Sequence, residues 1–320
     1  MEFYITIGDY QLMMLDSAEI HRSVELLADT CVLKVSAMAY NKVFSIGAGK
    51  DYPIQRGDKI EVNMGYNDNL EKEFSGYLQS ISTDGGILTL TCEDGLFLLR
   101  RPVKDKQFSK VDVKVIAAYL LQQTGVQMNL NCTLPIVYDK FVISKATAYD
   151  VLKKIQEETK ANIYVSDNDV PVLNIHSPYE DKTGDVRYSF QVNIEDSDLK
   201  YVSKEDKKVQ IIVKTTGKDG KLKEVKYGTT GGDQITLDRS GMNQKSLMQT
   251  AMNMYNSMLF DGYEGSVTGW LVPYAEPTMS AEIVDDEYPA KNGWYYVVSV
   301  TTTFDSSGGK RKVQLGKKLA

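Results

Sequence analysis

The chain has 320 residues, of which 42% are hydrophobic and 25% are charged, a composition typical of a globular protein with room for two or three domains. Its net charge is −6, and residues 1–100 hold 15 acidic but only 8 basic side chains, so the basic surface that sequence-specific nucleic-acid binding needs is absent. No apolar run reaches the roughly 18–20 residues of a membrane-spanning helix, and the first residues resemble no export signal. We therefore expect no membrane insertion, and a protein that is made in the cytoplasm.

The first hundred residues predict a β-rich domain, residues 1–100. Its turn signals are strong, above all Asp84-Gly85-Gly86, because glycine adopts the positive φ values of a tight hairpin turn without strain. A second turn signal, Gly57-Asp58, precedes an alternating strand. The expected strands are residues 3–7, 11–15, 30–38, 59–64, 74–82 and 87–92.

Residues 101–185 predict a small α+β domain. An apolar stripe with helical spacing indicates a helix over residues 111–124. A second helix is expected to begin after Thr147, whose hydroxyl can cap it together with Asp150 three residues later. Two short strands, residues 162–165 and 170–175, complete this domain.

Residues 186–320 return to strands and predict a second β-rich domain. It contains one helix, residues 246–259, for which Ser246 and Gln249 form a candidate capping box. A turn is expected at Lys218–Lys221. The expected strands are residues 186–192, 209–216, 222–227, 264–270, 279–284, 294–303 and 311–315.

A strand–turn–strand unit is predicted near each end of the chain. The first spans Gly76–Leu90 and the second Gly293–Leu315, and each has a glycine followed by an aromatic residue, a serine followed by a β-branched residue, and an Asp before two glycines. Each also follows an alternating strand. These shared features favour an internal duplication, although aligning the serines requires a gap.

No motif in the sequence carries catalytic or metal chemistry. His21 and His176 are the two histidines, and they favour structural roles; Cys31, Cys92 and Cys132 are far apart and favour buried, reduced thiols. Gly47–Lys50 lacks the remainder of a phosphate-binding loop. The acidic cluster Glu282, Asp285, Asp286 and Glu287 favours a solvated loop. We therefore predict no catalytic, cofactor-binding or metal-binding residues, and no enzyme activity.

The order of these segments resembles the baseplate hub proteins of contractile-tailed phages. Arg56–Val62 leads into a hairpin, an α+β middle holds a helix like Tyr149–Thr159, and the chain closes with the strands of Gly293–Gly316. This family includes the late control protein D family and the hub half of type VI secretion spike proteins. The resemblance covers most of the chain, and its ordered pattern rather than any single motif carries it.

The resemblance implies a β-rich α+β fold with two tail-tube-like β-barrel domains and a small α+β domain between them. It also implies a homotrimer with pseudo-sixfold symmetry, which joins a hexameric tail tube to a trimeric spike supplied by a separate chain. Baseplate wedge and tape-measure proteins are further expected partners. The expected location is the virion tail baseplate of a phage or prophage, or a related contractile injection system, assembled in the bacterial cytoplasm. The acidic N-terminal third suggests a lumen that does not hold DNA.

Two alternatives stay open from the sequence. The 20 tyrosines and two tryptophans are compatible with a carbohydrate-binding or adhesive tail protein. A peptidoglycan-cleaving tail enzyme would need carboxylates such as Glu264 or Glu282. Interface residues are not identified by the sequence.

Overall fold

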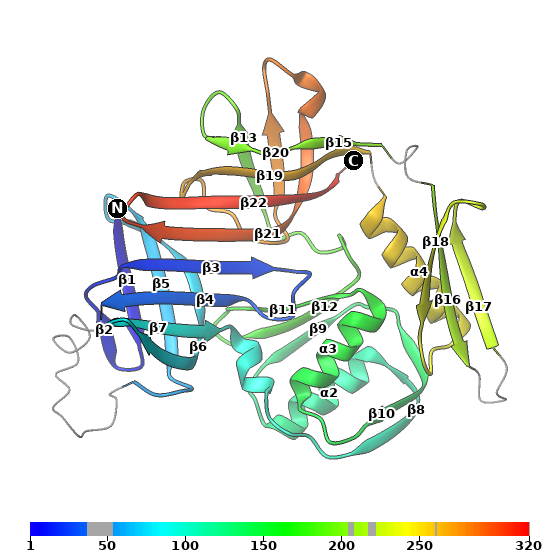
Figure 1. Ribbon diagram of the computed structural model, residues 1–320. Helices are drawn as coiled ribbons and strands as arrows, with labels where there is room; N and C mark the ends of the chain where they lie inside the picture. Colours follow the sequence, from blue (N-terminus) through cyan, green and yellow to red (C-terminus); the bar gives the residue numbers. More distant parts are fainter. Residues whose placement is uncertain (37–53, 204–207, 217–221, 260, 320) are drawn as a thin grey trace. The chain divides into compact units, whose positions relative to one another are not determined.

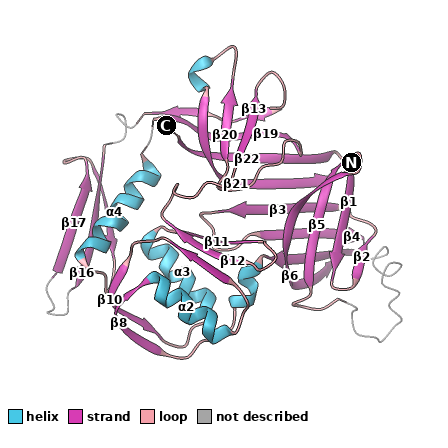
Figure 2. Cartoon of the chain, turned by 180° about the vertical axis from the view of Figure 1, so that it is seen from behind, coloured by secondary structure: helices cyan, strands magenta, loops and turns pink. Residues whose placement is uncertain are grey.

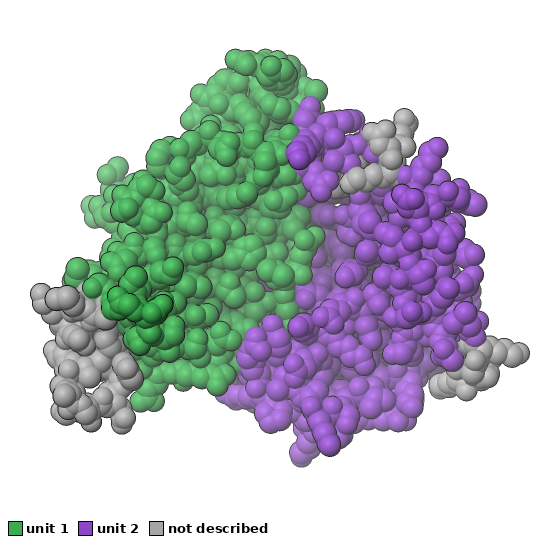
Figure 3. All heavy atoms as spheres, in the orientation of Figure 1, with its two compact units in different colours: residues 1–97, 184–199, 265–315 green, residues 98–183, 200–264, 316–320 purple. Residues whose placement is uncertain are grey.

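The computed structural model describes residues 1–36, 54–203, 208–216, 222–259 and 261–319. Within them the chain divides into two compact units, which Figure 3 colours separately: residues 1–97, 184–199 and 265–315 form unit 1, and residues 98–183, 200–264 and 316–320 form unit 2. The expected Gly47–Lys50 loop and Lys218–Lys221 turn lie outside the described residues. No helix in the described part of the chain has the length and apolarity to cross a membrane.

Unit 1 is built on one continuous sheet, whose strands follow one another in the order β14-β19-β22-β21-β3-β4-β7-β6-β5-β1-β2. Figures 1 and 2 show β22, β21, β3 and β4 side by side in this order. Strand β20 pairs with β21, and β13 pairs with β20. The bounds are β1 Glu2–Ile7, β2 Tyr10–Leu12, β3 Ser17–Ser23, β4 Thr30–Ser36, β5 Lys59–Tyr66, β6 Asn69–Asp84, β7 Ile87–Glu93, β13 Asp185–Ser189, β14 Asp196–Ser197, β19 Gly262–Trp270, β20 Ser280–Val284, β21 Gly293–Asp305 and β22 Gly308–Lys318.

The core of unit 1 lies where β1, β5 and the first half of β6 pack across β3, β4 and β7 (Figure 1). Alternating residues of these strands enter it, because side chains of a strand point to opposite faces in turn. Ile5, Val62, Leu33 and Leu90 are all 0% exposed. The alternating apolar residues of the predicted strands therefore face this core.

Unit 2 combines three helices with short strands (Figure 2). Helices α2 and α3 pack on β8, β9 and β11, and α4 packs on β16 and β17. The bounds are β8 Lys106–Asp112, α2 Val113–Thr124, β9 Asn129–Cys132, β10 Val137–Ile143, α3 Ala148–Thr159, β11 Asn162–Ser166, β12 Val172–His176, β15 Lys200–Val202, β16 Val209–Thr216, β17 Leu222–Gly228, β18 Asp233–Asp238 and α4 Gln244–Met258. Two short 3-10 helices, η1 Gly95–Leu99 and η2 Pro289–Lys291, complete the elements.

The helix caps agree with the sequence in one case and differ in another. Thr147 caps α3, with its hydroxyl accepting from the Asp150 N–H and the Asp150 carboxylate accepting from the Thr147 N–H, as predicted. The predicted capping box of Ser246 in α4 is wrong. Asn243 is the N-cap and accepts from the Ser246 N–H, while the Ser246 hydroxyl accepts from the Val137 N–H of β10.

The β-rich α+β class expected from the sequence is confirmed. The division into two tube-like barrel domains with an α+β domain between them stays a prediction, since the described strands of unit 1 follow an open path from β14 to β2. Helix α4, expected in the second β-rich domain, belongs to unit 2 together with residues 98–183. One physical reason is the Asn253 side chain, which is buried and donates to the Thr159 carbonyl at the end of α3.

Candidate assembly surface

The hairpins β6–β7 and β21–β22 occupy equivalent places in two similar groups of strands. Each closes with a two-residue loop, between Asp84 and Ile87 in the first and between Asp305 and Gly308 in the second. The neighbours also correspond, because the strand orders are β3-β4-β7-β6-β5 and β14-β19-β22-β21-β20. The predicted strand–turn–strand units are therefore both hairpins. Matching Asp84 with Asp305 requires no gap, and it aligns Ser80 with Thr301 instead of Ser299.

The two groups differ in what covers the outer edge of the long strand. In the second hairpin, β21 pairs with β3 from Ser299↔Ser23 to Phe304↔Ala18. In the first hairpin, β5 covers β6 only up to Tyr77. Leu78 still donates to the Asp58 carbonyl and accepts from the Gly57 N–H on this side, so within the described residues Gln79–Asp84 pairs on one side only, with β7. Unpaired backbone donors and acceptors on such an edge are a template for another strand.

Strand β14 forms the opposite end of the sheet. It pairs with β19 through Asp196↔Thr268 and Ser197↔Val267, and the described strands place nothing on its other side. The Asp198 carboxylate anchors the end of this edge, because its Oδ1 accepts from both the N–H and the hydroxyl of Ser266, at 2.5 and 3.0 Å. Hydrogen bonds to the charged form lower the pKa of Asp198.

One face of the sheet points away from the core and is dominated by hydroxyl groups. We call it the hydroxyl-rich face. The registers place Thr301 beside His21, His21 beside Thr30, and Glu19 beside Val32 on this face. Its Ser and Thr side chains come from β21, β3, β4, β7 and β6, and are Ser299, Thr301, Thr303, Ser17, Ser23, Thr30, Ser36, Thr91, Thr89, Ser82 and Ser80.

Charge on the hydroxyl-rich face is sparse and mixed. The same registers place Glu19 and Asp84 on it, and Lys34 lies between their strands. Glu93, at the end of β7, also belongs to this face but is 3% exposed. The acidic character of residues 1–100 is therefore not concentrated here.

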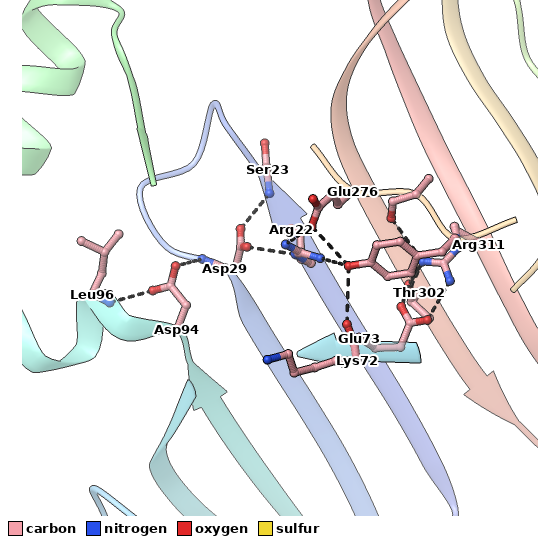
Figure 4. A network of polar contacts seen from close by, with 12 residues as sticks. Arg22, Ser23, Asp29, Lys72, Glu73, Asp94, Leu96, Glu276, Thr302 and Arg311 are labelled. Atoms are coloured by element: carbon pink, nitrogen blue, oxygen red, sulfur yellow. Dashed lines mark hydrogen bonds and ion pairs between the residues drawn. The ribbon is translucent and has the colours of Figure 1, made fainter. Parts of the chain in front are cut away.

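A buried ion pair joins the two groups of strands behind this face (Figure 4). Arg311 in β22 contacts both carboxylate oxygens of Glu73 in β6, at 2.7 and 2.9 Å, and both side chains are 2% exposed or less. Arg311 also donates to the Leu271 and Ala275 carbonyls and to the Thr302 hydroxyl. A planar guanidinium suits such two-point recognition of a carboxylate. The pair links strands that are 238 residues apart.

A second, partly buried cluster lies beside it and is centred on Arg22 in β3. The Arg22 guanidinium donates to the Tyr274 hydroxyl at 2.7 Å and to Glu276 at 3.0 Å, and it contacts Asp29 at 3.4 Å. Asp29 and Asp94 lie next to each other, since the Asp29 N–H donates to the Asp94 carboxylate. Burial raises the pKa of both carboxyl groups. The cluster therefore ties β3 to the segment that follows β19.

Both histidines have ordinary polar partners. His21 lies on the hydroxyl-rich face, with its Nδ1 2.9 Å from the Thr301 hydroxyl. His176 is buried in unit 2, with its Nδ1 2.8 Å from the Thr133 hydroxyl and its Nε2 3.3 Å from the Asn131 amide. The sequence interpretation of both as structural residues agrees with these contacts.

The acidic cluster organises a loop. Burial disfavours the Asp285 charge, but hydrogen bonds from the Lys291 ammonium and from the Tyr288 and Glu287 N–H groups outweigh it and lower the pKa of Asp285 to about 2. Glu282 instead pairs with Arg187 of β13 at 3.4 Å. The part of the chain that the structure describes contains no group of three or more His, Cys, Asp or Glu residues able to hold a metal ion.

The three cysteines are free thiols. Cys31 and Cys92 are buried and lie opposite each other in β4 and β7, and burial raises the pKa of both. Cys132 is half-buried, and burial again raises its pKa. None of the three has the environment of an activated thiolate.

Solved structures with the same fold are phage tail and secretion proteins. A tail protein from Neisseria meningitidis MC58 matches with a TM-score of 0.70 and 13% identity, over 98% of this chain and 96% of that one. The 43 kDa tail protein of prophage MuSo2 from Shewanella oneidensis matches with a TM-score of 0.67 and 15% identity, over 99% and 98%. No family model and no curated protein matches the chain.

A third match comes from a secretion system. The E. coli c3393 protein is a component of the type VI secretion system with structural similarity to the bacteriophage T4 tail proteins gp27 and gp5; it matches with a TM-score of 0.60 and 9% identity, over 100% of this chain and 77% of that one. These similarities extend along the chain and establish its fold as that of phage tail proteins. The resemblance drawn from the sequence is confirmed at this level.

Proposed function

We propose that the protein is the structural hub of a phage-type tail baseplate, a homotrimer that joins a hexameric tail tube to a trimeric spike. The observation that carries this proposal is the repeated strand order β3-β4-β7-β6-β5 and β14-β19-β22-β21-β20. Two similar groups per chain give six groups in three chains. Such a ring matches a sixfold tube on one side and a threefold spike on the other.

The full-length fold similarity to tail proteins supports a structural role in a virion tail or prophage tail. In this proposal β1–β7 form one tube-like domain, and β13, β14 and β19–β22 form the second. Residues 101–185 supply the α+β part between them. Wedge and tape-measure proteins are further proposed partners, and assembly takes place in the bacterial cytoplasm before the tail is complete.

We further propose that the hydroxyl-rich face lines the passage through the ring. Hydroxyl groups hydrogen-bond water, while the mixed charges of Glu19, Asp84 and Lys34 give no strong field to retain a passing polymer. This replaces the acidic lumen suggested by the sequence. The nearly neutral, hydrated wall, rather than repulsion, would keep DNA from binding.

The proposal assigns no enzyme activity. The Glu282 carboxylate pairs with Arg187, and the neighbouring Asp285 is held by Lys291 and by backbone N–H groups. Incubation with purified cell wall is expected to release no soluble fragments.

The test of the hub role is the stoichiometry of the full chain in complex with its tube and spike proteins, measured by native mass spectrometry. We expect three copies of this chain with six tube subunits and three spike subunits. A complex with one, two or six copies would contradict the proposal. A monomer that binds glycans and ignores the tube and spike proteins would instead favour the adhesive alternative.

A further inference from the structure

We propose that the outer edge of β6, Gln79–Asp84, pairs antiparallel with the outer edge of β14 in a second copy of this chain. The pairing would repeat between chains the contact that β21 makes with β3 within the chain. This inference rests on the proposed hub function and adds to it the two strands, and their register, through which neighbouring copies join.

The internal repeat fixes which residues correspond. Asp84 and Asp305 both precede a two-residue loop, so Ile81 of β6 corresponds to Thr302 of β21. Cys92 and Val313 each lie eight positions after these aspartates, and they pair with Cys31 of β4 and Val267 of β19. Strand β4 therefore corresponds to β19, residue by residue.

The same comparison matches the two outer strands. Ile20 of β3 pairs with Cys31, and Ser197 of β14 pairs with Val267, so Ser197 corresponds to Ile20. Within the chain, Thr302 pairs with Ile20 and Thr303 with Glu19. Transferred to two copies, this register places Ile81 opposite Ser197 and Ser82 opposite Asp196.

Backbone hydrogen bonding agrees with this register. In the β6–β7 hairpin the pair Asp84↔Ile87 closes a two-residue loop, so the backbone groups of Asp84 bond to β7. Along β6 the backbone groups of successive residues point alternately toward β7 and away from it. The N–H and C=O groups of Ile81 and Thr83 therefore point away from β7. On β14, the Asp198 N–H donates to the Ser266 carbonyl, so the Ser197 groups point away from β19. Ile81 and Ser197 thus present complementary donors and acceptors to each other.

The side chains agree as well. Ser82 lies on the hydroxyl-rich face, since it is opposite Thr89. Asp196, opposite Thr268, lies on the corresponding face of the second group. A slip by one residue would move every side chain of one strand to the wrong face. The match of hydrogen bonding and face together selects this register.

The contact is head-to-tail, because each copy offers one β6 edge and one β14 edge. Such heterologous contacts close into a ring or continue as a filament, depending on the rotation between copies. In the proposed hub the ring closes after three copies. A closed ring leaves no unpaired edge of this kind, which removes a template for aggregation.

The register is tested by disulfide trapping in the full chain. In a Cys132→Ser background, Ser82→Cys is combined with Asp196→Cys, a pair expected to lie opposite without mutual backbone hydrogen bonds, where β-carbons come closest. Mild oxidation is expected to give a covalent trimer on a non-reducing gel and no larger species. The matched control combines Ser82→Cys with Ser197→Cys, which is one residue out of register and on the opposite face of β14, and is expected to give little covalent product.

A second variant pair tests the edge without cysteines. Thr83→Pro removes an N–H that points outward, which an edge strand tolerates, while Thr83→Ala removes the same side chain and keeps the N–H. We expect at least tenfold weaker trimerisation for Thr83→Pro than for Thr83→Ala, at equal thermal stability of the monomers.

The outcomes separate this inference from the hub function. Suppose that the wild-type complex contains three copies. If the Ser82–Asp196 cysteine pair is then trapped no better than its control, or if Thr83→Pro assembles like Thr83→Ala, the edge pairing is overturned and the hub function stands. A wild-type chain that stays a single copy in the presence of tube and spike proteins overturns both.

Discussion

Arg311 and Glu73 form a two-point ion pair in the interior of unit 1, with nitrogen–oxygen distances of 2.7 and 2.9 Å. The pair holds β22 against β6, and so connects the two groups of strands that the proposed ring repeats. Charges this deeply buried stabilise a fold only while both partners are present, because each alone would lack compensation for its lost hydration.

Removing one partner of this pair is expected to be costly. Glu73→Ala leaves the Arg311 guanidinium buried without its carboxylate, and should lower the free energy of unfolding by about 3–5 kcal/mol. The double variant Glu73→Leu/Arg311→Met removes both charges and should recover most of the loss. Urea unfolding of the three proteins measures this. A single variant as stable as the wild type would show that the pair is not formed in solution.

Asp94 is expected to make stability depend on pH. Burial, and then the neighbouring Asp29, raise the pKa of Asp94 well above its usual value of 3.8 in the folded protein. A carboxyl group whose folded pKa is raised stabilises the fold when protonated, and this contribution is lost as pH rises from 3.8 through the folded pKa. Asp94→Asn should therefore flatten the fall in melting temperature over that range. A variant with the wild-type slope would contradict this assignment.

Asp150 should act in the opposite direction. Hydrogen bonds from the Thr147 hydroxyl and N–H lower the pKa of Asp150 below 3.8, so its contribution is present above that pH and is lost as pH falls through the folded value. Asp150→Asn should cost roughly 0.3–1.5 kcal/mol near neutral pH, as expected for one half of a capping box. The difference between variant and wild type should shrink under acidic conditions. A constant difference between acidic and neutral pH would exclude this role.

Helix α4 provides a test of the corrected cap. Asn243→Ala removes the side chain that accepts from the Ser246 N–H, and should cost about 1 kcal/mol of stability. Asn243→Asp keeps an acceptor and should cost little. If the sequence prediction of Ser246 as the cap were correct, Asn243→Ala would have no effect on thermal unfolding.

Ser246 has a different role, which its own variant should reveal. Ser246 is 1% exposed, and its hydroxyl accepts from the Val137 N–H at 2.7 Å. Ser246→Ala leaves that N–H without this partner and should cost about 1–3 kcal/mol. Hydrogen exchange should quicken at Val137 in β10, whereas loss of a cap would quicken exchange in the first turn of α4.

Local signals in the sequence were sufficient for the hairpins and for α3. Asp84-Gly85-Gly86 predicts a tight turn from its glycines, and both glycines have positive φ. Thr147 and Asp150 predict a helix start because both halves of the capping box lie within four residues. The signal in each case is confined to neighbouring positions.

The strands that form the candidate assembly surface were harder to predict. The sequence does not predict strand β3, because Glu19, His21 and Arg22 interrupt its apolar alternation, nor β14, which has only two residues. The open edge of β6 exists because its pairing with β5 ends at Tyr77. The equivalent strand, β21, is covered at this position by β3, which lies more than 270 residues away in the sequence. Such long-range register is not encoded in any short segment.

The same limit applies to the buried network. Glu73 directly precedes the predicted strand 74–82 and Arg311 begins the predicted strand 311–315, and neither has a local feature that marks it as buried. Only the alignment of β6 with β22 brings them together, across 238 residues. The burial of these two charges can therefore be predicted only once the order of the strands in the sheet is known.

The most direct test of the proposed hub is a three-dimensional reconstruction by electron cryomicroscopy of the full chain bound to its tube protein. We expect three chains around one axis, six similar strand groups in the ring, and Gln79–Asp84 of each chain paired with β14 of the next. A reconstruction with a single chain, or with three chains whose strand groups do not form a ring, would contradict the central claim.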